Sequence, residues 1–293
     1  MGVKCKQQYE GNGFALYNGD SCEVMKAIPD NSVHYSIFSP PFAQLYVYSN
    51  SVRDLGNCRD TTEFYTQFEF IIQELYRIMI PGRLVSMHCM DLPTQKMRDG
   101  FIGLIDFPGQ LIHMMCNAGF IYHSRVTIWK DPVVEMQRTK ALGLLHKQLK
   151  KDSAMCRQGK ADYIITFRKP GENSERIEHT NETFPVSKWQ NYASPVWMDI
   201  NQSKTLQKES AREEKDEKHI CPLQLDVIER CIELWTNEND IVFTPFLGIG
   251  SECYQALSMN RRAVGIELKE SYYNQAVANC KGIVSAPKMK KLF

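Results

Sequence analysis

IVFTPFLGIGSECYQALSMNRRAVGIE, residues 241–267, is the stretch of sequence that decides the fold class. The apolar run 241–243 predicts a strand, and the glycine-rich segment 247–250 predicts a tight turn. Residues 251–259 have the pattern of a helix, and residues 262–266 that of a second strand. A strand, a crossover helix and a second strand form a βαβ unit, so we expect an α/β protein with a parallel sheet.

Two glycines in the turn and an acid at the end of the second strand predict a cofactor site. Gly248 and Gly250 let the backbone turn sharply, and they leave room for a ligand where a Cβ would clash. Glu267 ends the second strand, and a carboxylate there can accept hydrogen bonds from both hydroxyls of a ribose. Cys253 replaces the third glycine of the dinucleotide fingerprint. The pattern therefore favours a nucleoside-containing cofactor without phosphates.

A rigid tetrapeptide near the start of the sequence is the candidate catalytic segment. Only a short segment follows the cofactor unit, so we expect the catalytic part to precede that unit. Ser39, Pro40, Pro41 and Phe42 come directly after a predicted strand over 32–38. Two consecutive prolines prevent helix formation and strand pairing, so the segment leaves the sheet as an extended loop. Open parallel sheets bind their ligands just past the carboxyl ends of the strands.

The chemistry that suits this tetrapeptide is activation of an exocyclic amino group of a nucleobase. Such an amine is a poor nucleophile because its lone pair is delocalised into the ring. If its two N–H groups donate to the Ser39 hydroxyl and the Pro40 carbonyl, the nitrogen is drawn toward tetrahedral geometry and the lone pair becomes available to a methyl donor. Phe42 offers a flat face on which a flipped base can stack. The alternative interpretation is a stiff strand exit without a catalytic role.

The remaining apolar patterns extend the sheet and add helices. The clearest is residues 61–79, where apolar residues recur on one face of a helix at Phe64, Phe68, Ile71, Leu75 and Ile78. Further helices are predicted over 107–118, 221–235 and 271–280, and strands over 83–89, 120–129 and 162–167.

These elements divide the sequence into three parts. Residues 1–170 are expected to form the catalytic half of one large domain, and residues 219–293 its cofactor-binding half. Residues 171–218 are polar, carry Trp189 and Trp197, and include the charge run KESAREEKDEK. We interpret them as a polar connection or a small lobe, with ordinary packing as the expected role of the tryptophans.

The charge distribution points to one candidate surface for nucleic acid. The net charge of the 293 residues is only +1, so the total does not favour a nucleic acid partner. Between residues 136 and 160, however, a single acid, Asp152, stands against seven basic residues: Arg138, Lys140, Lys147, Lys150, Lys151, Arg157 and Lys160. We expect this segment to be a basic helical insertion that contacts DNA phosphates, and an exposed helical hairpin without a ligand is the alternative.

Other features indicate a cytoplasmic protein without a metal site. The sequence shows no apolar run near the roughly 20 residues that a membrane helix needs, and no secretory signal at its start. The ten cysteines form no CxxC pair, so we expect reduced thiols and no metal. His88 and Cys89 are interpreted as the buried end of a strand.

On these motifs the sequence resembles the amino methyltransferases of DNA in which the catalytic motif precedes the cofactor motif. SPPF at 39–42 is similar to the family's (S/D/N)PP(Y/F), TPFLGIGSE at 244–252 to its DPFxGxGTT-like loop, and GIEL at 265–268 to its ribose-binding strand. Two departures are Thr244, where an acid is common, and Ser251-Glu252 in place of two threonines. Residues 16–42, 68–85 and 219–242 also look similar to family segments, and ASPVWMDI at 193–200 to methylases of phages and prophages.

The resemblance implies a doubly wound, seven-stranded, Rossmann-like methyltransferase sheet with one antiparallel strand, and S-adenosylmethionine as the cofactor. It implies cofactor contacts from Asp20, Cys221, Pro222, Thr244, Phe246, Gly248, Gly250, Ser251, Glu267 and Leu268. Asp20 corresponds to the acid that contacts the adenine, and Cys221 and Pro222 to the pocket of the methionine moiety. A flipped base in DNA is the implied substrate, in a bacterial or phage-infected cell. The resemblance also makes a homodimer and a cognate restriction nuclease possible partners.

The choice of base stays open between two amines. A serine at position 39 is associated in this family with cytosine N4 enzymes and an aspartate with adenine N6 enzymes, which favours cytosine N4. RNA is an alternative substrate for the same chemistry. Two other classes of protein remain as alternatives: a nicotinamide-dependent oxidoreductase, which leaves SPPF without a purpose, and a DNA-binding module without enzymatic activity.

Overall fold

A computed structural model describes residues 3–41, 61–94, 96–139, 142–207 and 222–285. Phe42, Lys140, Cys221 and the charge run at 208–218, all singled out in the sequence, lie outside the described residues.

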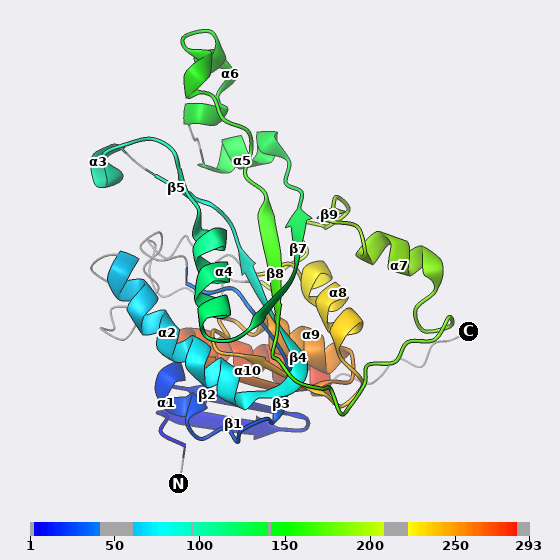
Figure 1. Cartoon of the computed structure of the whole chain (residues 1–293). Coiled ribbons are helices and arrows are strands. Elements are labelled where there is room, and N and C mark those ends of the chain that lie inside the picture. The colour runs from blue at the N-terminus through cyan, green and yellow to red at the C-terminus, as the bar shows by residue number, and fades with distance from the viewer. Residues whose placement is uncertain (1–2, 42–60, 95, 140–141, 208–221, 286–293) are drawn as a thin grey trace.

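One large sheet runs through the described part of the chain (Figure 1). Its strand order is β1-β2-β11-β10-β3-β4-β8-β7-β9. The strands are β1 (Gln7–Gly11), β2 (Phe14–Asn18), β3 (Val33–Phe38), β4 (Met79–Cys89), β7 (Ile121–Ile128), β8 (Asp162–Arg168), β9 (Val196–Trp197), β10 (Ile241–Thr244) and β11 (Arg262–Glu267). The principal helices are α1 (Ser21–Met25), α2 (Thr61–Ile78), α4 (Phe107–Asn117), α8 (Leu225–Trp235), α9 (Ser251–Ser258) and α10 (Glu270–Ser285).

The α/β fold class is confirmed, but the sheet has nine strands where seven were expected. Strands β2, β11, β10, β3 and β4 are parallel neighbours, and β8 is antiparallel to both β4 and β7. These seven strands, with β8 reversed, form the expected sheet. The two additional strands lie at its edges, where β1 is antiparallel to β2 and β9 is parallel to β7. Both are short, and strands of two to five residues leave little periodic signal in a sequence.

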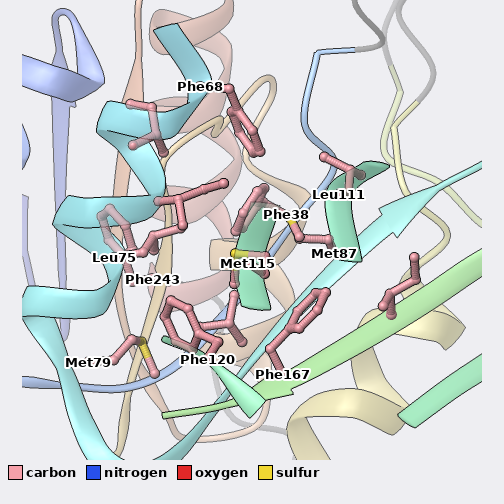
Figure 2. Close-up of a cluster of buried hydrophobic side chains, with 14 of the residues drawn as sticks. Phe38, Phe68, Leu75, Met79, Met87, Leu111, Met115, Phe120, Phe167 and Phe243 are labelled. Atoms are coloured by element: carbon pink, nitrogen blue, oxygen red, sulfur yellow. The ribbon is translucent and has the colours of Figure 1, made fainter. Parts of the chain in front are cut away.

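Helices cover both faces of the sheet, which makes the fold doubly wound. On one face α1, α2 and α4 bury their apolar residues against β3, β4 and β8 in a single hydrophobic cluster. Figure 2 shows part of this cluster, with Phe38, Phe68, Met87 and Phe243 packed together. On the other face α8, α9 and α10 form a second cluster with β2, β3 and β10. Each fully buried large apolar side chain stabilises the fold by about 1.5–3 kcal/mol.

Helix α2 forms as its sequence pattern predicts. The five apolar residues of its predicted face are all buried: Phe64, Phe68, Ile71, Leu75 and Ile78. Their spacing of three and four residues places them on one side of a helix, and that side covers the sheet beside β3 and β4. Packing therefore fixes α2 against the strand that leads into the tetrapeptide SPPF.

Two insertions extend from the sheet (Figure 1). After β4 come β5 (Leu92–Pro93), α3 (Lys96–Asp99) and β6 (Leu104–Ile105), and after β7 come α5 (Pro132–Thr139) and α6 (His146–Leu149) with two short 3-10 turns. The second insertion is the basic segment of the sequence, and it consists of short helical pieces. Because β4 and β7 run in the same direction, both insertions begin at the same edge of the sheet.

The described part of the polar segment, residues 171–207, contains α7 (Val186–Tyr192) and β9. Trp197 is buried, as ordinary packing requires, whereas Trp189 is exposed. Among the described helices, none combines the length and the apolar character that a membrane crossing needs.

Candidate active site

The candidate active site lies at the carboxyl edge of two neighbouring strands. Strand β3, which ends at Phe38, and strand β10, which ends at Thr244, pair in parallel. The buried Ser36 hydroxyl strengthens this pairing by donating a hydrogen bond of 3.0 Å to the Phe243 carbonyl. Strand order thus brings the tetrapeptide SPPF close to residues 245–250 between β10 and α9, which we call the glycine loop. About 200 residues separate these two segments in the sequence.

The glycine loop turns from β10 into α9 through two residues with positive φ. Gly248 has φ +53° and Gly250 has φ +92°, a region that side chains rarely adopt. A Cβ on Gly250 would lie 3.0 Å from the Ala276 Cβ, so this glycine is required by the packing of α10. A Cβ on Gly248 would meet no atom within 4 Å. Gly248, rather than Gly250, is therefore the glycine that faces open space.

Glu267 holds the glycine loop through its carboxylate. Its Oε2 accepts a hydrogen bond of 2.7 Å from the Gly248 N–H, and its Oε1 accepts one of 2.9 Å from the Lys269 N–H. Each carboxylate oxygen can accept more than one hydrogen bond, so these contacts leave the chemistry of a ribose-binding acid intact. The side chain is half-buried at the end of β11.

The start of α1 is attached to the same place. The Gly19 N–H and the Asn18 side chain both donate to the Glu267 carbonyl, at 3.0 and 2.9 Å. The Ser21 hydroxyl donates to the Pro245 carbonyl at 2.5 Å. Between them, the Asp20 carboxylate caps α1 by accepting from the Cys22 N–H at 2.9 Å. Asp20, Glu267 and the glycine loop, which the sequence assigns to the cofactor site, therefore lie next to one another.

Two further polar groups of this region stand out by their burial. The Thr244 hydroxyl oxygen is buried and has no hydrogen-bond partner among the described residues. Glu252, at the start of α9, is also buried, and burial raises its pKa to about 8. Ser251 is buried, Phe246 and Leu268 are half-buried, and Pro222 is half-buried ahead of α8.

The side of the site that carries Ser39 contains a row of polar contacts that the sequence did not reveal. Register pairs Phe38 with Met87, so Ser39 follows β3 beside His88 near the end of β4. The Ser39 hydroxyl and His88 Nδ1 are hydrogen-bonded at 3.0 Å. Pro40 is buried and Pro41 is half-buried, whereas Phe42 lies outside the described residues.

The row continues across β8 and the end of β7. His88 Nε2 lies 3.1 Å from Asp162 Oδ2, and the Lys130 ammonium lies 2.5 Å from Asp162 Oδ1. Burial by itself would raise the pKa of Asp162, but the His88 imidazole and the Lys130 ammonium lower it to about 2. Asp162 is therefore an ionised, buried carboxylate at neutral pH.

The basic insertion presents only part of the predicted set of cations to solvent. Lys147, Lys150 and Lys151 are exposed. Arg157 is instead half-buried, because its guanidinium lies 3.5 Å from Glu135 and its backbone N–H donates to the Gly143 carbonyl. Arg157 thus holds the insertion together. The side chain of Arg138 lies outside the described part of the structure, as does Lys140.

A separate polar cluster lies at the opposite edge of the sheet, around the amino ends of β3, β4 and β10. The ligand atoms of His34, Glu175 and Asp240 lie within 4.8 Å of one another. The buried Arg83 guanidinium lies 3.1 Å from Asp240 and 3.9 Å from Glu175. A positive charge is therefore already present, and the cluster is an ion-pair network that joins the strands.

Comparison with known proteins adds to this geometry. The family model described as DNA methylase matches residues 33–278. The type II methyltransferase M.BglII of Bacillus subtilis is 24% identical over 277 residues, which cover 89% of this chain and 67% of that protein.

Two solved structures share the fold. That of a putative DNA modification methylase from Thermus thermophilus, complexed with S-adenosyl-L-methionine, has a TM-score of 0.70 at 21% identity and covers 93% of this chain and 95% of that one. That of the cytosine-N4-specific PvuII DNA methyltransferase has a TM-score of 0.68 at 16% identity and covers 97% of this chain and 94% of that one. At these identities the two similarities demonstrate a common fold.

Proposed function

This chain belongs to the family of DNA methylases that act on amino groups of bases, and from that premise we propose that it transfers a methyl group from S-adenosylmethionine to N4 of cytosine in DNA. The observation that carries the proposal is the parallel pairing of β3 with β10. This pairing sets Ser39 and Pro40 beside the loop that Glu267 holds, so a target amine and a methyl donor can meet at one edge of the sheet.

The residues around the glycine loop fit a nucleoside cofactor without phosphates. Glu267 offers a carboxylate for the ribose hydroxyls, and the space beside Gly248 admits the ligand close to the backbone. Asp20 stands at the position that contacts the adenine in the family, and the buried Thr244 hydroxyl has hydrogen-bonding capacity that the described residues do not satisfy. The cofactor supplies the methyl group as an electrophilic substituent of a sulfonium.

The residues of the tetrapeptide would activate the acceptor amine. One N–H donates to the Ser39 hydroxyl oxygen and the other to the Pro40 carbonyl, which fixes the nitrogen and directs its lone pair toward the methyl group. The ring of Pro40 fixes its φ, and Pro41 restricts the ψ of the residue before it, so the Pro40 carbonyl keeps its direction during the reaction.

Cytosine N4 is favoured over adenine N6 by the residue at position 39. Ser39 stands where the family carries serine in cytosine enzymes and aspartate in adenine enzymes. The PvuII enzyme, whose fold this chain shares, is cytosine-N4-specific. Adenine N6 is the second candidate, because the two amines present the same pair of N–H groups to the tetrapeptide.

The basic insertion provides a surface for the DNA. It begins after β7, at the same edge of the sheet as the candidate site, and its exposed cations are Lys147, Lys150 and Lys151. Lysines at such a position contact phosphates and orient a duplex without reading its sequence.

The decisive experiment identifies the modified base. The full chain is incubated with duplex DNA and S-adenosylmethionine carrying a deuterated methyl group, and the DNA is digested to nucleosides for mass spectrometry. We expect labelled N4-methylcytosine, and none with the Ser39→Ala variant. Labelled N6-methyladenine would overturn the choice of base. No labelled nucleoside, together with thermal stabilisation by a nicotinamide dinucleotide but not by S-adenosylhomocysteine, would overturn the enzyme class.

A further inference from the structure

We propose that His88 is a positioning residue that withdraws the proton of Ser39 during methyl transfer, with Asp162 stabilising the imidazolium that forms. This inference rests on the proposed function and assigns the route by which the acceptor amine loses its proton. Methyl transfer to an amine leaves a positively charged nitrogen, so some group must take a proton before a neutral methylated base is released.

Four residues from four neighbouring strand ends form this route. In the order of the sheet, Ser39 follows β3, His88 lies near the end of β4, Asp162 begins β8, and Lys130 follows β7. Successive contacts are 3.0 Å from Ser39 Oγ to His88 Nδ1, 3.1 Å from His88 Nε2 to Asp162 Oδ2, and 2.5 Å from Asp162 Oδ1 to Lys130 Nζ. The contacts lead from the tetrapeptide into the interior, since His88 and Asp162 are both buried.

The position of Asp162 determines which ring nitrogen of His88 carries the proton. A carboxylate 3.1 Å from Nε2 favours the tautomer with hydrogen on Nε2. Nδ1 then has a lone pair and accepts the hydrogen bond from the Ser39 hydroxyl. With its own hydrogen directed at His88, the Ser39 oxygen presents only lone pairs to a substrate. It can therefore accept from an amine N–H but cannot donate to, and so block, the lone pair of the amine nitrogen.

Methyl transfer and proton transfer follow one another in this route. The nitrogen lone pair forms the bond to the methyl carbon, and the carbon–sulfur bond breaks with its electrons left on sulfur. The nitrogen then gives one N–H proton to Ser39 Oγ while the original hydroxyl proton moves to His88 Nδ1. The positive charge that began on the sulfonium ends on His88, and water takes the proton before the next turnover.

The charges around His88 suit this task. Asp162 is ionised and faces the imidazole, and Lys130 balances Asp162 in the resting state. Two further titratable groups interact with Asp162: burial lowers the pKa of Lys160 and raises the pKa of the Cys89 thiol. Asp162 therefore stabilises an imidazolium without being basic enough to take the proton itself.

A serine, a histidine and an aspartate in contact are also the arrangement of hydrolytic enzymes. In such enzymes the backbone N–H of the residue after the serine often helps to bind the oxyanion. Here that residue is Pro40, and the next is Pro41, so neither has an N–H. The carbonyl of Pro40 is an acceptor, which suits an amine and not an oxyanion.

The first test is single-turnover methyl transfer to duplex DNA that contains the target base in its unmethylated form, measured from pH 5.5 to 9. His88→Asn keeps an acceptor near the Nδ1 position but cannot take a proton, and the exposed His113→Asn serves as control. We expect His88→Asn to lower the rate by roughly 10²–10⁴-fold. The dissociation constants for S-adenosylmethionine and DNA should change less than about twofold. We expect the rate of the unmodified protein to rise with pH, and we expect the variant to lose that rise. A rate and pH profile equal to those of the control would overturn the inference.

The second test needs no activity and no variant of His88. The ¹⁵N chemical shifts of the His88 ring in the unmodified protein report its tautomer, and Ser39→Ala reports the hydrogen bond to Nδ1. We expect hydrogen on Nε2 and a shift of Nδ1 alone in Ser39→Ala. Hydrogen on Nδ1 would overturn the inference even if DNA methylation is confirmed. If the protein methylates no nucleic acid, the proposed function fails, and the tautomer still decides whether this row of residues is built as described.

Discussion

The rings of Phe38 and Phe246 lie in contact, with centroids 5.7 Å apart. Phe38 is the last residue of β3 before Ser39, and Phe246 lies in the glycine loop between β10 and α9. Phe68 of α2 stacks on Phe246 at 6.2 Å and packs in the same cluster. The two segments that carry the candidate chemistry are therefore supported by one aromatic cluster, so we expect a displacement of either to affect the other.

We expect Phe246→Ala to lower the free energy of unfolding by about 2–3 kcal/mol, because it removes a partly buried ring and leaves a cavity beside Phe38. The same change should weaken both cofactor binding and turnover, since both loops lose their common support. Urea denaturation and calorimetric titration with S-adenosylhomocysteine measure the two effects. The exposed Phe101→Ala is the matched control, and an equally small effect of both substitutions would contradict the coupling.

Ser39→Ala should reduce turnover by at least about 100-fold while leaving the cofactor dissociation constant nearly unchanged. The hydroxyl orients the acceptor amine and is hydrogen-bonded to His88, whereas the glycine loop is held by Glu267. Steady-state methylation and calorimetry separate the two quantities. A comparable loss of cofactor affinity would show that Ser39 belongs to the cofactor pocket instead.

Glu267→Ala should have the opposite signature. Loss of the carboxylate removes both the expected ribose contact and the acceptor that holds the Gly248 N–H. We expect the cofactor dissociation constant to rise by about 10–100-fold, since a hydrogen bond to a charged group contributes about 1.5–3 kcal/mol. Turnover at saturating cofactor should fall much less. The cofactor dissociation constant of Glu267→Gln, which keeps an acceptor oxygen, should lie between those of the unmodified protein and Glu267→Ala. An unchanged affinity in Glu267→Ala would exclude Glu267 from the cofactor pocket.

Much of the fold could be predicted from periodicity alone. The βαβ unit at 241–267 and helix α2 formed where their apolar patterns indicated, because both bury a continuous face against the sheet. The edge strands β1 and β9 and strand β2 next to β1 were missed, since pairing with a neighbour, not their own composition, makes them strands. The different roles of the two loop glycines could not be predicted either. Only the packed position of Ala276 reveals that Gly250 is the glycine needed for contact with α10.

The site could be predicted in part. Ser39 and Glu267 stand at strand ends that carry recognisable motifs, so their placement at the same edge of the sheet follows from the order of the parallel strands β11, β10 and β3. His88 was interpreted only as a buried strand end, which is correct as far as burial goes. The contact of His88 with Ser39 depends on the register of β3 with β4. The contact of His88 with Asp162 depends on the register of β4 with the antiparallel strand β8, more than 70 residues away in the sequence. Neither register leaves a signal in a single sequence.

The pKa of Glu252 predicts how stability depends on pH. Burial raises this pKa from 4.5 to about 8, so between these values the folded protein keeps a proton that the unfolded chain releases. Stability should therefore fall as pH rises from about 4.5 to 8, and one unit of pKa shift corresponds to about 1.4 kcal/mol. Glu252→Gln removes this dependence and should raise the melting temperature at pH 8 more than at pH 5. The exposed Glu238→Gln is the control, and a larger gain at pH 5 would contradict the assignment.

The basic insertion predicts a salt dependence that distinguishes phosphate contacts from an exposed surface without a ligand. Lys147, Lys150 and Lys151 are exposed on the insertion that begins at the active edge. Each lysine that neutralises a phosphate adds about 0.9 to the slope of log affinity against log salt concentration. Replacing all three with glutamine should lower that slope by about 2–3, in fluorescence anisotropy titrations with duplex DNA, and should weaken binding equally for different sequences. Arg157→Gln should instead lower stability with a smaller change in slope, because its guanidinium lies beside Glu135. An unchanged slope in the triple variant would remove the insertion from the DNA interface.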